Sequence, residues 1–267
     1  MNAEESIRKG FHSRLMAPFT RACRDYRLIN NGDHIAVCIS GGKDSMLMAA
    51  LFLELKRHPE VDFDLTFLVM DPGYTEENRA LIESNARSLD IPITIFNTSI
   101  FEDAGTVNKG MCYKCARMRR GHLYKKAEEL GCNKIALGHH YDDVIETVLM
   151  GMLYGGQIRS MMPKLRSTNY KGMELIRPMY LIREEDICAW RDHNGLKFLD
   201  CACSLTALRD EGDAVSKRQE IKELIADLKK KNPSVEANIF SSMENVDIDT
   251  VIEYKKAGIR HNFLEDY

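Results

Sequence analysis

The stretch HIAVCISGGKDSMLMAALFLELKRH (residues 34–58) joins an apolar run, a pair of glycines and a helical pattern. A short continuous apolar run that ends in glycines is typical of a buried parallel strand. The residues that follow the glycines are apolar on nearly every side, which indicates a buried helix. This stretch therefore predicts a strand, a tight turn and a helix in direct succession.

The alternation of strand and helix continues along the chain. Three further apolar runs predict strands: LTFLVMD (65–71), ITIFNTSIF (93–101) and NKIALGHH (133–140). Helical patterns follow them at residues 75–89, 115–130 and 142–156. Strands that alternate with helices predict an α/β fold, with a parallel sheet covered by helices on both faces.

The two ends of the chain depart from this alternation. Residues 11–28 form an amphipathic helical pattern with a break near Pro18, and residues 218–232 form a basic-ended helix that Pro233 stops. The remaining C-terminal residues are expected to be helical with breaks. We therefore expect an N-terminal helical segment (1–33), a central α/β domain (34–205) and a C-terminal helical region (206–267).

Composition excludes several classes of protein. The chain has 267 residues, 44% of them hydrophobic and 29% charged, with a formal net charge of −3. No apolar stretch reaches the roughly 20 residues that span a bilayer, and the first residues lack the apolar core of a secretory signal. We expect a cytoplasmic protein with no membrane partner. A negative net charge is not typical of a protein that binds nucleic acid, although local basic clusters can still exist.

The glycine loop (residues 40–45, SGGKDS) carries the sharpest chemical signal. Glycines let the backbone approach an anion closely, and the start of a helix attracts negative charge. The spacing matches neither GxxxxGK[ST] nor GxGxxG. These features predict a loop that binds a phosphate or pyrophosphate group. The alternative is a tight turn whose polar residues bind no ligand. The residues expected to hold the phosphates are Ser40, Gly41, Gly42, Lys43, Asp44 and Ser45.

A carboxylate motif (residues 138–143, GHHYDD) follows the fourth predicted strand. Ligands bind at the carboxyl ends of the strands in such sheets, so this motif and the glycine loop should face the same site. Adjacent carboxylates near a triphosphate suggest Mg²⁺. In the alternative, Asp142 or Asp143 only caps the following helix.

The eight cysteines fall into two groups. Four are isolated and are expected to be small buried apolar residues: Cys23, Cys38, Cys132 and Cys188. The others form a CxxC (Cys112, Cys115) and a CxC (Cys201, Cys203). In a reducing compartment, grouped cysteines favour metal or redox chemistry. A [4Fe–4S] cluster on three cysteines, a zinc site on four and a catalytic disulfide all remain open, because spacing does not decide between them.

Basic residues follow the CxxC within one predicted helix: Arg117, Arg119 and Arg120. Such a run is often only a solvated face. Next to a nucleotide site, it predicts a surface that binds RNA phosphates.

These motifs together resemble a known family. SGGKDS after an apolar strand resembles the PP-loop of the N-type ATP pyrophosphatases, and GHHYDDVIET (residues 138–147) resembles the GHHxDDxxET of PP-loop enzymes that act on tRNA. With the CxxC, the R-x-R-R stretch and the late cysteine pair, the chain resembles the tRNA 2-thiocytidine synthetase family over nearly its whole length.

The resemblance implies a Rossmann-like doubly wound sheet and cleavage of ATP between its α and β phosphates. It implies nucleotide contacts at Met70, Asp71, Gly138 and Asp143, and catalytic roles for Lys43, Asp44, Asp143 and Cys203. It also implies a [4Fe–4S] cluster on Cys112, Cys115 and Cys203. The family's late cysteines are three apart and here they are two apart, so Cys201 is the rival third ligand.

The expected activity is ATP-dependent thiolation of tRNA. We expect adenylation of the C2 carbonyl of a cytidine in the anticodon loop, followed by replacement of oxygen with sulfur. Expected partners are tRNA, Mg²⁺ and a sulfur donor, either a cysteine desulfurase or sulfide; the resemblance also suggests a homodimer. The alternatives are a 2-thiouridine-forming enzyme, a cluster-free amidotransferase or lysidine-type ligase, and an RNA-binding module without turnover.

Overall fold

The computed structural model describes residues 3–98, 111–199, 217–265 and 267, and describes side chains from residue 118 onward in the helix that begins at residue 111. Its contacts divide the chain into two units. The first comprises Met1–Asp143 and Met162–Ala214, and the second comprises Val144–Met161 and Val215–Tyr267. The domain boundaries expected at residues 33 and 205 stay predictions, and residue 205 lies outside the described residues.

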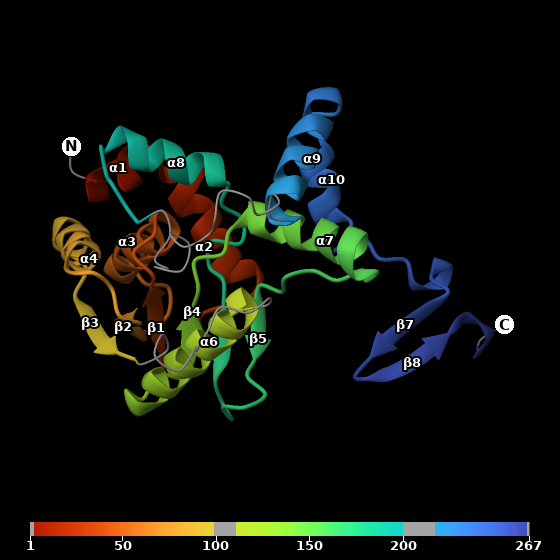
Figure 1. Cartoon of the computed structure of the whole chain (residues 1–267), viewed down its shortest axis with the longest axis horizontal. Helices are drawn as coiled ribbons and strands as arrows, with labels where there is room; N and C mark the ends of the chain where they lie inside the picture. Colours follow the sequence, from red (N-terminus) through yellow and green to blue (C-terminus); the bar gives the residue numbers. More distant parts are fainter. Residues whose placement is uncertain (1–2, 99–110, 200–216, 266) are drawn as a thin grey trace. The chain divides into compact units, whose positions relative to one another are not determined.

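A six-stranded sheet forms the centre of the first unit (Figure 1). Its strands are β1 (Asp33–Ile39), β2 (Phe63–Asp71), β3 (Ile93–Asn97), β4 (Lys134–Ala136), β5 (Lys164–Arg166) and β6 (Glu174–Ile176). They are ordered β3-β2-β1-β4-β6-β5, and each pairing is parallel except that of β5 with β6. The predicted parallel α/β sheet is confirmed. The sequence does not predict β5 and β6, because runs of three residues show no periodicity.

Helices accompany the sheet on both faces. In the first unit they are α1 (Ala3–Lys9), a π-helical turn (His12–Met16), α2 (Ala17–Asp25), α3 (Lys43–Arg57), α4 (Glu76–Ser88), α6 (Met111–Glu129) and α8 (Glu184–His193). The predicted break near Pro18 is the change from the π-helical turn to α2, where proline occupies the first turn and needs no N–H partner. Helix α7 (Tyr141–Gly155) starts in the first unit and continues into the second.

Alternate residues of β1 face two separate apolar cores. Ile35 and Val37 belong to the larger core, which includes residues of α1, α2, α3 and α8. Ala36 and Cys38 point to the other face and pack with Tyr124 and other residues of α6. Successive side chains of a strand point to opposite faces, so a strand buried on both faces needs the continuous apolar run seen in the sequence.

The strand order reverses between β1 and β4, and this position determines where a ligand is expected. Strands β2 and β3 lie on one side of β1, while β4 and β6 lie on the other. In open parallel sheets, ligands bind outside the carboxyl ends of the strands at such a switch point. The glycine loop follows β1 and the carboxylate motif follows β4, so both predicted motifs lie at the switch point.

The second unit is not wholly helical, and here the predicted C-terminal helices are partly wrong. It contains the rest of α7, then α9 (Lys217–Lys231), α10 (Val235–Ser241), two short 3₁₀ turns (Ile248–Thr250 and Phe263–Glu265) and a hairpin of β7 (Glu253–Lys256) with β8 (Ile259–Asn262). Ala257 and Gly258 form the two-residue turn with φ of 51° and 85°. Two consecutive residues with positive φ are what a type I′ hairpin turn requires and what a helix excludes.

Among the described helices, none is both long and apolar enough to cross a membrane.

Candidate active site

The glycine loop connects β1 to the first turn of α3. The hydroxyl of Ser45 accepts a hydrogen bond from the Ser40 N–H (3.1 Å) and donates one to the Gly42 carbonyl (2.9 Å), which folds the loop back on itself. Gly42 is the N-cap of α3 and, being glycine, offers no side-chain acceptor to the first-turn N–H groups. Those N–H groups and the helix dipole therefore suit an anion at the end of the sheet.

Glycines also allow close backbone approach in both motifs. Gly41 has a φ of +85°, and a Cβ there would lie 2.7 Å from Cγ1 of Ile82. A Cβ on Gly138 would lie 3.1 Å from the Ser45 nitrogen and 3.2 Å from the Asp44 carbonyl carbon. Gly138 thus lies directly against the glycine loop, and the structure brings the two predicted motifs into contact.

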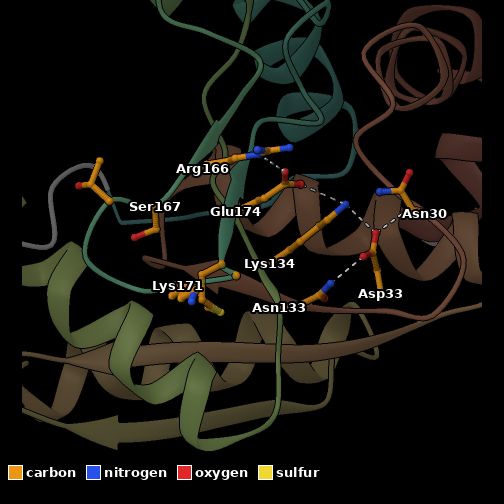
Figure 2. A pocket seen from close by; sticks show the side chains of 11 residues that line it. Asn30, Asp33, Asn133, Lys134, Arg166, Ser167, Lys171 and Glu174 are labelled. Atoms are coloured by element: carbon orange, nitrogen blue, oxygen red, sulfur yellow. Dashed lines mark hydrogen bonds and ion pairs between the residues drawn. The ribbon is translucent and has the colours of Figure 1, made fainter. Parts of the chain in front are cut away.

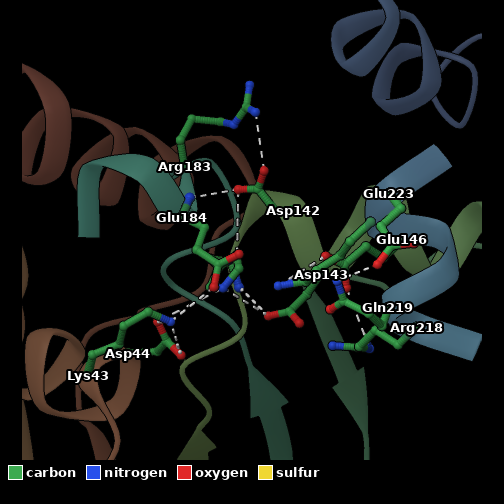
Figure 3. Close-up of polar contacts among 12 residues, drawn as sticks. Lys43, Asp44, Asp142, Asp143, Glu146, Arg183, Glu184, Arg218, Gln219 and Glu223 are labelled. Carbon is green, nitrogen blue, oxygen red and sulfur yellow. Dashed lines mark hydrogen bonds and ion pairs between the residues drawn. The ribbon is translucent and has the colours of Figure 1, made fainter. Parts of the chain in front are cut away.

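Lys43 is held between two carboxylates (Figure 3). Its Nζ lies 3.0 Å from Oδ1 of Asp44 and 3.1 Å from Oε1 of Glu184. Burial acts to lower the pKa of Lys43, but the charges and hydrogen bonds of Asp44 and Glu184 outweigh it and raise the pKa above its ordinary value. At neutral pH, Lys43 is therefore a cation beside the start of α3, where a phosphate would compete for it.

The two carboxylates of the second motif have different partners. Asp142 accepts hydrogen bonds from the backbone N–H of Glu184 (2.7 Å) and from Nη2 of Arg183 (3.1 Å), as Figure 3 shows. Since α8 begins at Glu184 and Arg183 offers no side-chain cap, Asp142 caps this helix from outside it. Asp142 therefore caps α8, not the following helix α7 that the capping alternative named.

Asp143 contacts His140 of the same motif. Its Oδ2 accepts a hydrogen bond from the His140 N–H (3.1 Å). The buried ring of His140 has Nε2 at 3.6 Å from Oδ2 of Asp143 and at 3.9 Å from Oδ1 of Asp44. His140 therefore lies between carboxylates of the two motifs.

The end of β2 supplies an apolar cluster and a structured turn. Met70 is buried and packs with Phe96, Met118 and Leu123, the last two from α6. The next residue, Asp71, accepts hydrogen bonds from the backbone N–H groups of Gly73 and Tyr74, both at 2.8 Å. Asp71 therefore shapes the turn beside the glycine loop.

The predicted basic residues of α6 do not all face the same way. Arg119 is half-buried and its charge acts on Tyr74, whose pKa burial nevertheless raises to about 12. Arg120 is exposed and acts electrostatically on Tyr124 and Arg177. Neighbouring residues on a helix are about 100° apart, which explains their divergence. The side chain of Arg117 lies outside the described residues.

The chain matches a known protein family and its members over most of its length. The family model of the PP-loop domain matches residues 12–204. The tRNA-cytidine(32) 2-sulfurtransferase of Coxiella burnetii (strain CbuG_Q212) is 36% identical over 256 residues, covering 94% of this chain and 97% of the relative. The protein of that name from Anaeromyxobacter dehalogenans (strain 2CP-C) is 35% identical over 236 residues, covering 87% and 79% of the two chains.

The chain belongs to the tRNA-cytidine 2-sulfurtransferase family of PP-loop proteins. The family predicted from the motifs is therefore confirmed. A solved structure, that of the U34-tRNA thiolase NcsA from Methanococcus maripaludis with its [4Fe–4S] cluster, matches with a TM-score of 0.66 over 88% of this chain and 78% of NcsA. At 22% identity, this match shows that the PP-loop protein shares the NcsA fold.

The predicted cluster ligands of this PP-loop protein are only partly described. Cys112 and Cys115 lie three residues apart in α6, one helical turn, and their side chains lie outside the described residues, as do Cys201 and Cys203 entirely. Within the described part of the chain, no group of three or more histidine, cysteine or acidic side chains is placed to hold a metal ion. The choice of third ligand stays a prediction.

Three of the four isolated cysteines belong to the apolar cores. Cys23, Cys38 and Cys132 are buried and free, and Cys188 is half-buried and free. Burial raises the pKa of the Cys23 and Cys38 thiols to about 12. The first three are therefore small core residues, as the sequence predicts.

The structure also adds residues that sequence reasoning misses. Glu184 contacts Lys43 across 141 residues of sequence, and Arg183 contacts Asp142. The acidic run at residues 184–186 signals a helix start, but nothing in it indicates contact with the glycine loop. Arg177, at the end of β6, is a third such residue.

The opposite end of the sheet has a cavity of about 620 Å³ (Figure 2). Buried Lys134 lies there, 2.7 Å from Asp33 and 3.5 Å from Glu174, and donates a hydrogen bond to the Leu28 carbonyl. This end carries the starts of β1, β4 and β6, away from both PP-loop motifs. The buried charges there, Lys134 and Asp33, are paired with each other, so we do not place the reaction there.

Proposed function

We propose that the chain is an ATP-dependent tRNA sulfurtransferase that converts a cytidine of the anticodon loop to 2-thiocytidine. The observation that carries this proposal is the contact of Gly138 with the backbone of Asp44 and Ser45, which joins the glycine loop to the carboxylate motif at the switch point. The family supplies the substrate class, because the similar proteins from Coxiella and Anaeromyxobacter are named for sulfur transfer to a tRNA cytidine.

The glycine loop and α3 would hold the ATP phosphates. The hydroxyls of Ser40 and Ser45, the backbone of Gly41 and Gly42 and the ammonium of Lys43 all lie at the start of α3. As pyrophosphate leaves, negative charge grows on it, and fixed donors stabilise that charge. The Met70 cluster offers an apolar surface for the adenine at the end of the neighbouring strand.

Asp44 and Asp143 are the residues that would hold Mg²⁺. Mg²⁺ is usually bound through one or two carboxylates together with substrate phosphates and water, so it needs no preformed protein cage. His140 lies between the two residues, within 3.9 Å of a carboxylate oxygen of each.

To replace the C2 oxygen of the base by sulfur, the enzyme must first convert that oxygen into a better leaving group. The C2 carbonyl oxygen attacks the α-phosphate of ATP, the α–β bond breaks and pyrophosphate departs. Sulfur at the sulfide level (HS⁻) then bonds to C2, the C2–O bond breaks so that the oxygen leaves with AMP, and the S–H proton is released. The base must be unstacked to reach the phosphate, which an anticodon-loop nucleotide permits.

Cys112, Cys115 and Cys203, with Cys201 as the rival, are the residues that would hold a [4Fe–4S] cluster. Three cysteinyl thiolates fit such a cluster, and the helix that carries the first two continues to Met118, which packs on Met70. When bound, the cluster supplies a site for the sulfur to be transferred. A sulfur donor (sulfide, or a cysteine desulfurase with a two-electron reductant that releases its persulfide sulfur as sulfide), a homodimer and a cytoplasmic location complete the proposal.

Nucleoside mass spectrometry of bulk tRNA, with and without the gene, tests the reaction and its substrate together. Loss of 2-thiocytidine alone is the expected result. Loss of a 2-thiouridine instead would move the substrate to uridine, and persistence of every thionucleoside would contradict the proposal.

Two matched variants test the cluster. Cys112→Ser should lose iron and sulfide on anaerobic purification and lose thiolation, while Cys188→Ser, at a half-buried cysteine of α8, should keep both. Stoichiometric zinc in the unaltered protein, or full thiolation by Cys112→Ser, would overturn this part of the proposal.

A further inference from the structure

Arg177 stands directly after β6, at the same end of the sheet as the glycine loop. It is 5% exposed. One of its nitrogens, Nη1, donates to the Met162 carbonyl, whereas Nε is buried and has no hydrogen-bond partner among the described residues. Arg177 also forms no ion pair with a carboxylate in that part of the chain. A guanidinium has five N–H donors in a planar fork, so the contact with Met162 leaves most of them uncommitted.

A second arginine acts electrostatically on the first. Arg120 of α6 is exposed, and it acts electrostatically on Arg177. Burial, and then the charge of Arg120, lower the pKa of Arg177 to about 10. Tyr124, one turn after Arg120 in α6, packs in the same buried cluster as Leu175 of β6, two residues before Arg177. Both arginines also act electrostatically on Tyr124.

Two neighbouring cations, one of them buried, favour a bound anion. The carboxylate of Asp143 acts electrostatically on Arg177 and raises its pKa, but it forms no ion pair with Arg177 in the described part of the chain. Removing a charge from water without a paired partner is costly, and a second positive charge adds to that cost. A bound phosphate would accept hydrogen bonds from the planar fork of Arg177 and neutralise both side chains. The pair is therefore best explained as one half of a phosphate subsite.

The order of the strands indicates which phosphate is bound. Met70 lies at the end of β2, the glycine loop at the end of β1, and Arg177 at the end of β6, beyond β4. Neighbouring strands are about 4.8 Å apart, so β6 lies roughly 10 Å from β1 on the side away from the Met70 cluster. When ATP occupies the ends of β2 and β1, the β6 side of the sheet remains open for the RNA substrate.

We propose that Arg177 and Arg120 bind a backbone phosphate of the RNA next to the nucleotide that is modified. This subsite rests on the proposed function and extends it, because it assigns the approach of the RNA to the β6 side of the sheet. Arg177 supplies a fixed fork from the sheet, and Arg120 closes on the phosphate from the exposed side of α6.

The test measures binding of an unmodified tRNA transcript at several salt concentrations. Arg177→Gln, which keeps a donor for the Met162 carbonyl, should weaken binding about tenfold at 0.1 M salt and reduce the slope of log K against log salt by nearly one. Arg120→Gln should reduce the slope similarly. Affinity for ATP should stay within about twofold in both variants.

The matched control is Arg87→Gln, which removes the same charge from an exposed arginine in the last turn of α4. It should leave the slope unchanged. If Arg177→Gln is not folded by circular dichroism, Arg120→Gln alone decides, since its side chain is exposed.

An unchanged slope in the folded arginine variants overturns the subsite. So does a loss of ATP affinity with normal tRNA binding, which would assign the pair to a nucleotide phosphate. Failure of the unaltered protein to bind tRNA would instead contradict the proposed function, so the two failures are distinguishable.

Discussion

Buried cations have different partners at the two ends of the central sheet. At the amino ends of the strands, Lys134 is 2% exposed and its ammonium has two carboxylate partners, Asp33 and Glu174, and a carbonyl (Figure 2). At the carboxyl ends, Arg177 is 5% exposed and its described partner is a single carbonyl. The charge of Lys134 is balanced by carboxylates of the protein itself. Arg177 instead keeps hydrogen-bond donors that a ligand can use.

This difference separates structural charge from functional charge. A buried ion network that is satisfied internally holds strands together, and breaking it leaves a charge without a partner. A buried cation without a carboxylate partner contributes little to folding, but it gives a ligand more than an exposed cation would. Buried positive charge therefore serves stability at one end of the sheet and, in the proposed subsite, recognition of a phosphate at the other.

The largest expected effect on stability is at the amino end. Lys134→Met should lower the free energy of unfolding by about 3–5 kcal/mol, because Asp33 would be left as a buried unpaired carboxylate. Urea unfolding measures this. The double variant Lys134→Met, Asp33→Asn should recover part of the loss, and a cost below about 1 kcal/mol for the single variant would mean that the network is not closed as described.

The largest expected effect on catalysis is at the carboxyl end. Lys43→Met should lower the rate of tRNA-dependent AMP formation about 10²–10³-fold, because a cation beside the leaving pyrophosphate is lost. Unfolding in urea should hardly change. Lys56→Met, at the other end of α3, is the control and should keep the rate within about twofold. Equal losses in the two variants would contradict a specific role for Lys43.

Arg177→Met sharpens the comparison with Lys134. The change removes a buried charge together with the hydrogen bond to Met162, so the free energy of unfolding should change by about 1 kcal/mol or less. Urea unfolding without ligand, run beside Lys134→Met, is the measurement. A loss as large as that of Lys134→Met would show that Arg177 is as structural as the lysine.

A smaller effect concerns the apolar middle of the sheet, between the two charged ends. Burial raises the pKa of the Cys38 thiol from 9.0 to about 12. Below pH 9 the thiol is protonated in both states, and above it the unfolded chain loses the proton while the folded chain keeps it. Stability should therefore fall between about pH 9 and pH 12, by at most about 1.4 kcal/mol per pH unit for one thiol.

Unfolding in urea at pH 8 and pH 10 measures this decline. Cys38→Ala should show a shallower decline than the unaltered protein. Equal declines would mean that the thiol is already ionised or reached by solvent in the folded state.

Short sequence patterns predict those elements whose structure depends only on neighbouring residues. The run from His34 to Ser45 predicts β1, the glycine loop and the start of α3, because apolar continuity and adjacent glycines are local features. The carboxylate motif is predicted for the same reason. The contact of the two motifs through Gly138 follows from topology once the strands are parallel.

The parts that sequence does not predict depend on distant partners or weak patterns. Glu184 and Arg177 lie among ordinary helix-start and loop residues, and only the fold brings them to the glycine loop and to Arg120. Strands β5 and β6 are too short to show a period. The C-terminal hairpin is missed because its signal is a single glycine preceded by alanine.

The pairing of β1 with β4 has a consequence for the protein during its own synthesis. The hydrogen bond between Asp33 and Asn133 joins residues 100 positions apart, and Gly138 reaches the glycine loop only through this pairing. At roughly 5–20 residues per second, a ribosome makes the loop about 5–20 s before the strand that completes its surroundings. A growing chain thus carries the phosphate-binding motif without the contacts made by Gly138, and nucleotide binding should arise late, as a sign that the sheet has closed across its centre.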